Sequence, residues 1–259
     1  YKKMLIKKVL GFIPARSGSK GVPNKNIQPI KNIPLLEYSV FSAIKAKEKG
    51  YLSDVVVSTD SQDYLSILHG YNIEKEYIRP KKISGDSSPT IDSVMDVLKW
   101  YEKYKLTKFD AVMILQPTTP FRTPEHIREA IILMNSDLTL TCVASICKLA
   151  DHHPLRIKRL LSNGQLVNFC HDYAELEPSR RQDFNPDAYI RNGAIYLTKV
   201  KDLESTGLIR GSKVAGMVMP EANSINIDEH MDYIVAKESL DYDAFSSDLS
   251  FFQKLINKE

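Results

Sequence analysis

A short segment near the start of the chain combines glycine with several cationic side chains. The segment is GFIPARSGSKGVPNKN, Gly11–Asn26, and it carries Arg16, Lys20 and Lys25. Gly18 and Gly21 would let the backbone approach an anion closely and present N–H groups to it. Arginine adds a planar fork of donors, and each lysine adds a point charge. These residue types in this order predict a loop that binds a polyphosphate, although a solvated loop has a similar composition.

Two well-known phosphate loops do not fit this segment. The P-loop needs G-x-x-x-x-G-K-[ST], but Ser19 follows Gly18 and Gly21 follows Lys20. The dinucleotide fingerprint needs G-x-G-x-x-G, and the two glycines supply only its last spacing. The loop therefore indicates a different way of holding a phosphate chain.

The composition is that of an ordinary globular protein, with 43% hydrophobic and 26% charged residues. A net charge of +3 disfavours diffuse binding to nucleic acid but leaves room for a local cationic pocket. The three cysteines, Cys142, Cys147 and Cys170, form no C-x-x-C pair and are expected to be free thiols. No apolar run approaches the ~20 residues of a membrane span. We expect a cytoplasmic protein with neither nucleic acid nor membrane as a partner.

Strand patterns alternate with helical patterns through most of the chain. Expected strands are Lys8–Pro14, Asp54–Thr59, Ile73–Ile78, Asp110–Leu115, Leu138–Ile146, Tyr189–Thr198 and Val214–Met219. Expected helices include one around residues 35–44, one at Ile91–Tyr104, one opened by Thr123-Pro124 and one from Glu229. This alternation predicts an α/β fold built on a mostly parallel, Rossmann-like doubly wound sheet.

The alternation breaks between residues 151 and 188, which are polar and contain three prolines. Short strands are plausible there at Leu155–Leu160 and Gln165–Phe169. We interpret 151–188 as a dimerisation or sugar-pocket segment inserted into a single domain that spans 1–259.

Eight segments of the chain resemble the CMP-sugar synthetases, the cytidylyltransferases that activate sialic acid and related sugar acids. The first is Ile13–Gly21 together with Lys25-Asn26. The others are VSTD at Val57–Asp60, RP at Arg79-Pro80, LQPTTPFRT at Leu115–Thr123, HHPLR at His152–Arg156, RRQ at Arg180–Gln182, NGAIY at Asn192–Tyr196 and SINID at Ser224–Asp228. These segments follow one another in the same order as in the family, and the resemblance covers about residues 8 to 240. The His-His-Pro element is typical of the acylneuraminate cytidylyltransferase branch.

This resemblance implies a fold, a reaction and an assembly. The fold would be that of the nucleotide-diphospho-sugar transferases. The reaction would move CMP from CTP to the anomeric 2-hydroxyl of a nonulosonic acid of the sialic type and release pyrophosphate. Magnesium or manganese would assist, and the protein would be a homodimer whose inserted arm reaches the neighbouring subunit.

The resemblance also assigns roles to individual residues. The nucleotide would be held by Ala15, Arg16, Ser17, Gly18, Lys20, Lys25, Asn26, Arg79 and Asp86, and the sugar acid by Gln116, Arg181, Gln182, Tyr189 and Asn192. Arg16, Lys20, Lys25 and Asp228 would be the catalytic residues. Arg181 suits the C1 carboxylate, because arginine binds carboxylates through two parallel hydrogen bonds. Asp86 has a plain alternative role as a carboxylate that caps a turn.

The expected metal site departs from the family pattern. The family usually has Asp-x-Asp, whereas this chain reads Asn226-Ile227-Asp228. If these residues form a strand, alternation places Asn226 and Asp228 on one face. Asp228 would then be the main metal ligand, with the carbonyl oxygen of Asn226 beside it. Alternatively, both residues cap the following helix.

Several alternatives remain at this stage. The acceptor could be N-acetylneuraminate, a legionaminate, a pseudaminate or an octulosonate. Asn226 also allows a nucleotide-binding homologue with impaired catalysis. A glycosyltransferase that uses a formed nucleotide-sugar is weaker, because no mid-sheet Asp-x-Asp is present.

Overall fold

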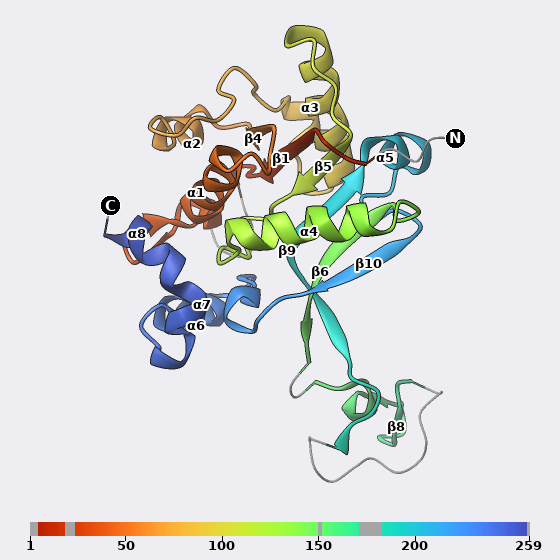
Figure 1. The fold of residues 1–259 in the computed structure, drawn as a ribbon. Coiled ribbons are helices and arrows are strands. Elements are labelled where there is room, and N and C mark those ends of the chain that lie inside the picture. Colours follow the sequence, from red (N-terminus) through yellow and green to blue (C-terminus); the bar gives the residue numbers. More distant parts are fainter. Residues whose placement is uncertain (1–4, 19–23, 150–151, 171–182, 258–259) are drawn as a thin grey trace.

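A six-stranded sheet forms the centre of the molecule (Figure 1). The computed structural model describes residues 5–18, 24–149, 152–170 and 183–257. The sheet order is β10-β6-β9-β5-β1-β4. These strands are β1 (Val9–Pro14), β4 (Asp54–Ser58), β5 (Ala111–Ile114), β6 (Cys142–Lys148), β9 (Tyr189–Lys199) and β10 (Val214–Val218).

The sheet is mostly parallel. Strand β1 pairs in parallel with β4 and β5, and β10 pairs in parallel with β6. Strand β9 alone in this sheet runs the other way, antiparallel to both β5 and β6. The predicted α/β class with a mostly parallel sheet is confirmed. The register matches Phe12 on β1 with Ile114 on β5, so both strands end at the same edge of the sheet.

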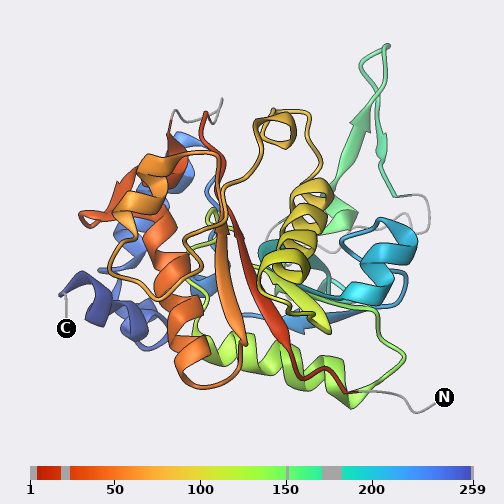
Figure 2. The same cartoon turned by 90° about the horizontal axis from the view of Figure 1, so that it is seen from above.

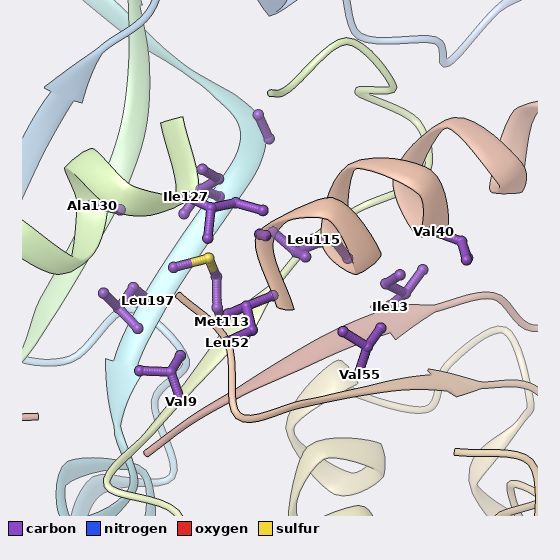
Figure 3. Packing of buried hydrophobic residues seen from close by; sticks show 14 of the residues in the cluster. Val9, Ile13, Val40, Leu52, Val55, Met113, Leu115, Ile127, Ala130 and Leu197 are labelled. Atoms are coloured by element: carbon purple, nitrogen blue, oxygen red, sulfur yellow. The ribbon is translucent and has the colours of Figure 1, made fainter. Parts of the chain in front are cut away.

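Helices cover both faces of the sheet (Figure 2). Helices α1 (Leu35–Glu48) and α4 (Pro124–Ser136) lie on one face. There Val40 and Ile127 pack on the strand residues Ile13 and Met113 in one buried cluster (Figure 3). Helices α3 (Thr90–Tyr104) and α5 (Val200–Thr206) supply Val94 and Leu203 to a second cluster on the other face. Burial on both faces explains why the central strands read as nearly continuous apolar runs.

The predicted helix starts follow from local capping. The side chain of Thr123 accepts a hydrogen bond from the backbone N–H of His126, and Pro124 occupies the first turn of α4. Glu229 caps α6 (His230–Ser239) in a capping box with Asp232. Outside residues 151–188, the remaining described α-helices and strands are α2 (Gln62–Ile67), α7 (Ser246–Leu249), α8 (Gln253–Ile256), β2 (Pro29–Ile30) and β3 (Ile33–Pro34).

A small hairpin lies away from the sheet, in the region expected to be an inserted arm (Figure 1). Its strands are β7 (Lys158–Leu160) and β8 (Leu166–Asn168), which pair antiparallel. Both lie inside the stretches where short strands were expected. The role of 151–188 in dimerisation stays a prediction, and residues 150–151 and 171–182 lie outside the described part of the chain.

Two predicted strands differ from the structure. Ile73–Ile78, described in full, forms only an isolated bridge from Glu74 to Val56, because its charged residues cannot continue a buried sheet. The strand expected at Leu138 begins at Cys142, after a turn in which the Leu140 N–H bonds to the Asp137 carbonyl. The condition considered for Asn226 and Asp228, that they lie on a strand, is not met: a 3-10 helix, Ala222–Ser224, leads into an irregular segment.

In the described part of the chain, no helix is both long enough and apolar enough to cross a membrane.

Candidate functional site

A polar cavity opens at the carboxyl ends of β1 and β5, where open α/β sheets bind ligands. Its volume is about 420 Å³, within the usual range for small-molecule sites. It is lined by Pro14, Arg16, Lys25, Asn26, Arg79, Asp86, Ser88, Thr90, Ser93, Gln116, Pro117 and Thr118. We call it the nucleotide pocket, after the ligand that the sequence predicts for its residues. It brings together six residues that the sequence singled out: Arg16, Lys25, Asn26, Arg79, Asp86 and Gln116.

The glycine-rich loop leaves β1 and is held down by a carboxylate. Asp60 accepts hydrogen bonds from the backbone N–H of Ser17 at 2.8 Å and from its hydroxyl at 2.9 Å. Burial works to raise the pKa of Asp60, but the bonds from Ser17 outweigh it and lower the pKa below its usual value. Ala15 is buried and donates to the Ser58 carbonyl, and Gly18 has φ +75. Asp60 therefore remains a charged carboxylate and holds the start of the loop in place.

The second half of the loop returns to the pocket at Lys25 and Asn26. Asn26 is buried and its side-chain amide donates to the carbonyl oxygen of Arg16 at 3.1 Å. The amine of Lys25 donates to the carbonyl of Ile227 at 2.9 Å and lies 3.5 Å from a carboxylate oxygen of Asp228. Lys25 thus links the loop to the segment expected to bind metal. Lys20 lies outside the described residues.

Two arginines face the pocket from different sides. Arg16 forms an ion pair with Asp86 at 2.5 Å, and both side chains are about one-third exposed. Asp86 therefore pairs with the loop arginine in the wall of the pocket, and its role as a turn cap stays an alternative. Arg79 is 5% exposed and donates to the hydroxyl and carbonyl oxygens of Ser58. Burial lowers its pKa from the usual arginine value.

Asn226 and Asp228 meet even though they do not lie on a strand. The amide nitrogen of Asn226 donates to a carboxylate oxygen of Asp228 at 2.5 Å, and the Asn226 oxygen accepts from Thr119 at 3.2 Å. Neither side chain caps α6, which Glu229 does. The Asp228 side chain is 67% exposed, so the carboxylate is open to a ligand.

These oxygens fit a magnesium ion that is shared with a substrate. Among the described residues no group of three His, Cys, Asp or Glu side chains could hold a metal by itself. Mg²⁺, however, is commonly bound through one or two carboxylates together with substrate phosphates and water. The exposed carboxylate of Asp228 beside a cationic pocket suits that arrangement, whereas the Asn226 amide turns its nitrogen to Asp228 and its oxygen to Thr119.

Gln116 stands on a loop that a buried arginine holds in place. Arg122 is 0% exposed; its Nε donates to Ala194, one terminal nitrogen donates to Ser39, and the other donates to the carbonyls of Gln116 and Thr119. The described structure gives it no carboxylate partner. Burial lowers the pKa of Arg122 to about 9, which leaves it protonated at pH 7.

A second cavity of about 480 Å³ adjoins the nucleotide pocket. It is lined by Pro89, Thr90, Ile91, Ile114, Gln116, Tyr196, Gly207, Leu208, Ile209, Arg210 and Gly211. Thr90 and Gln116 belong to both cavities. No sequence motif singled out the 207–211 segment. Its only signal was a glycine at each end of a short break between a helix and a strand.

The other predicted sugar-binding residues are placed differently or not described. Asn192 is 5% exposed, and its side chain bonds to Ser145 and Ser224 inside the fold. Tyr189 begins β9 opposite Lys148, and neither Tyr189 nor Asn192 is among the residues that line the two cavities. Arg181 and Gln182 lie outside the described residues. Their roles in sugar binding stay predictions.

Sequence comparison relates the chain to cytidylyltransferases. The model of the family described as cytidylyltransferase matches residues 10–151. The chain is 30% identical over 230 residues to N-acylneuraminate cytidylyltransferase of Escherichia coli O18:K1:H7, covering 88% of this chain but 51% of that protein. It is 28% identical to CMP-N,N'-diacetyllegionaminic acid synthase of Legionella pneumophila, covering 90% and 97%. The chain therefore spans about half of the first relative and nearly all of the second.

Solved structures support the same fold. CMP:2-keto-3-deoxy-manno-octonic acid synthetase complexed with CTP aligns with a TM-score of 0.59 at 15% identity, over 89% of this chain and 99% of that one. 4-Diphosphocytidyl-2C-methyl-D-erythritol synthase from Anaerococcus prevotii aligns with the same TM-score at 16% identity, over 91% and 99%.

Proposed function

The chain belongs to the cytidylyltransferase family, and on this premise we propose that it transfers CMP from CTP to the anomeric 2-hydroxyl of a nonulosonic acid. Relatives named for N-acylneuraminate and for N,N'-diacetyllegionaminic acid support this class of acceptor. The products would be the CMP-sugar and pyrophosphate.

The observation that carries the proposal is the pair of adjoining cavities. The cationic one suits CTP, and the second, which we call the acceptor pocket, suits the sugar acid. Because Gln116 and Thr90 border both, two bound substrates would meet there. A transferase that joins two molecules needs this arrangement, whereas a protein that only binds a nucleotide does not.

The step is an in-line displacement at the α-phosphorus. The acceptor hydroxyl gives its proton to water, its oxygen bonds to the α-phosphorus, and the bond from that phosphorus to the oxygen bridging to the β-phosphate breaks, so that pyrophosphate leaves. Such reactions depend mostly on positioning and on neutralising charge. Arg16, Lys20 and Lys25 would hold the phosphates and stabilise the charge that grows on pyrophosphate. Asn26, Arg79 and Asp86 would frame the nucleoside.

Magnesium is the proposed cofactor, with Asp228 as its main protein ligand and Asn226 beside it. When bound, the ion would supply positive charge next to the phosphates. Asp228 is already oriented by the Asn226 amide and lies next to Lys25. An amide in place of the family's first carboxylate lowers the negative charge of the site and weakens a scheme with two metal ions.

Asn226→Asp tests this assignment. A second carboxylate beside Asp228 is expected to tighten Mg²⁺ binding by about fivefold or more, since a close unit charge contributes ~1 kcal/mol even in water. Activity should be preserved or raised. Calorimetric titration with Mg²⁺ and CTP measures the affinity, and Asp228→Asn should change it in the opposite direction. Loss of activity in a folded Asn226→Asp protein would contradict the ligand assignment.

Gly193→Ala tests the position of Gln116. Gly193 has φ +79, and a Cβ there would lie 2.6 Å from Oε1 of Gln116. Gly164→Ala is the matched control, with φ +85 and open space around the added carbon. Both variants should lose ~1–2 kcal/mol of stability from the left-handed backbone. Only Gly193→Ala should also lower kcat/KM for the acceptor, by about tenfold. Equal losses of activity in the two variants would show that Gln116 does not contribute to acceptor binding.

We further propose a homodimer formed through the arm. The arm and the start of β9 expose large apolar side chains that a lone subunit would leave in water: Ile157, Leu160, Leu166, Phe169, Tyr189 and Ile190. An arm that crosses to the neighbour would bring Arg181 and Gln182 to the partner's acceptor pocket, with Arg181 on the C1 carboxylate.

Leu160→Asp is expected to shift the protein towards monomers. Leu160 is 68% exposed on β7, so a charge there should disrupt a dimer contact and leave the fold of each subunit intact. Sedimentation velocity at micromolar concentration measures the change, and Leu106→Asp, at a site 89% exposed, is the control. A wild-type protein that sediments as a monomer would refute the dimer.

The function itself is tested by incubating the protein with CTP, Mg²⁺ and a panel of nonulosonic and octulosonic acids while pyrophosphate is measured. Release of pyrophosphate that depends on a nonulosonic acid is the expected result. Binding of CTP without turnover of any acceptor would favour a nucleotide-binding homologue instead.

A further inference from the structure

The acceptor pocket has two chemically different ends. Thr90 and Gln116, which it shares with the nucleotide pocket, form a polar end. The 207–211 segment lines only the acceptor pocket and therefore marks the end away from the nucleotide. An acceptor whose 2-hydroxyl meets the α-phosphate at the polar end must direct the opposite side of its ring towards 207–211. In a nonulosonic acid that side carries the acylamino group and the three-carbon tail.

Hydrocarbon lines much of the acceptor pocket, including two side chains at the end away from the nucleotide. Leu208 and Ile209 belong to this segment, and Ile91, Ile114 and Pro89 line the same cavity. Ile209 is partly buried and packs against the cluster formed by α3, α5 and the sheet. A hydroxyl group buried against such a surface loses its bonds to water without replacement, whereas a methyl group gains from leaving water.

Arg210 is the one cationic side chain among the residues that line this cavity, and it is exposed. A guanidinium donates hydrogen bonds and accepts none. The carbonyl oxygen of an acylamino group is an acceptor and matches this donor. The tail best suited to this surface therefore has few hydroxyls and a terminal methyl group, and an acylamino group on the tail, in addition to the one on the ring, gives Arg210 a carbonyl acceptor in place of a hydroxyl.

We propose that the acceptor is a doubly N-acylated nonulosonic acid with a deoxygenated tail, of the legionaminate type, in preference to N-acetylneuraminate with its trihydroxylated tail. This inference rests on the proposed function, because it selects among acceptors of the same transfer reaction. Ile209 and Leu208 are the specificity-determining residues.

The test compares kcat/KM for N,N'-diacetyllegionaminate, N-acetylneuraminate and 9-deoxy-N-acetylneuraminate at saturating CTP and Mg²⁺. The diacyl acceptor is expected to be preferred over N-acetylneuraminate by about tenfold or more, with the 9-deoxy compound between them. Equal or better use of N-acetylneuraminate would overturn the inference and leave the transfer reaction established. No turnover of any of the three would overturn the proposed function.

Variants test the surface itself. Ile209→Ser should reduce the preference for the diacyl acceptor by at least fivefold, mainly through its KM. Leu208→Ser should act in the same direction, and its site is 55% exposed, so folding should tolerate the change. Ile132→Ser, at an exposed position on α4, is the matched control. An unchanged preference in both folded pocket variants would show that other residues select the acceptor.

Discussion

Replacing Lys25 with alanine is expected to lower kcat by about 100-fold or more, the usual loss when one preorganised donor to a developing negative charge is removed. The side chain of Lys25 is only 12% exposed, and its amine lies in the nucleotide pocket beside Asp228. A desolvated cation at this position stabilises the leaving pyrophosphate more strongly than a surface lysine could. Steady-state kinetics with CTP measure the effect.

The control for this variant is Lys45→Ala, which removes a lysine paired with Glu48 on the surface of α1. Its activity should stay close to that of the wild type. Lys25 also donates a hydrogen bond to the Ile227 carbonyl, so its contribution to the structure of the pocket has to be distinguished from its contribution to catalysis. If kcat is restored when Mg²⁺ is raised, Lys25 acts mainly by orienting Asp228, and its assignment to the phosphates is wrong.

Replacing Arg122 with methionine is expected to destabilise the protein by ~3 kcal/mol and to impair both substrate sites. The change leaves the carbonyls of Gln116, Thr119 and Ala194 without their donor, and each buried group that loses its partner costs ~1–3 kcal/mol. Removal of an uncompensated buried charge offsets part of this cost. For a chain of this size the melting temperature should fall by roughly 6–12 °C.

Arg128→Met is the matched control, because Arg128 lies on α4, shortly after Arg122 in the chain, but pairs with Glu125 at the surface. Its effect should stay within about 0.5 kcal/mol. Arg122→Lys retains the charge with fewer donors and should give an intermediate loss, together with a raised KM for the acceptor as the Gln116 loop loosens. Thermal unfolding and kinetics measure both effects. A stable, fully active Arg122→Met protein would show that the loop holds its shape without the arginine.

The sequence alone determined the family, the α/β class and most elements of the sheet. Strands such as Asp54–Ser58 were readable because burial on both faces requires an unbroken apolar run. The start of α4 was readable because Thr123-Pro124 satisfies the first turn locally. The cationic loop could be predicted because its charges, its glycines and their spacing all belong to one short segment.

Only the tertiary structure decided which residues share a pocket. The meeting of Lys25 with Asp228 joins residues 203 positions apart, and no local pattern contains that contact. The hydrogen bonds of the Asn192 amide with Ser145 and Ser224 are likewise set by the fold, and the role of Asn192 in sugar binding stays a prediction. The sequence does not distinguish Arg122 from an exposed arginine. Its burial and its four hydrogen-bond partners depend on how the whole chain packs. Ile209 and Arg210 carry no motif at all, because a pocket wall depends on where a connection lies over the sheet, and packing of the whole chain sets that position.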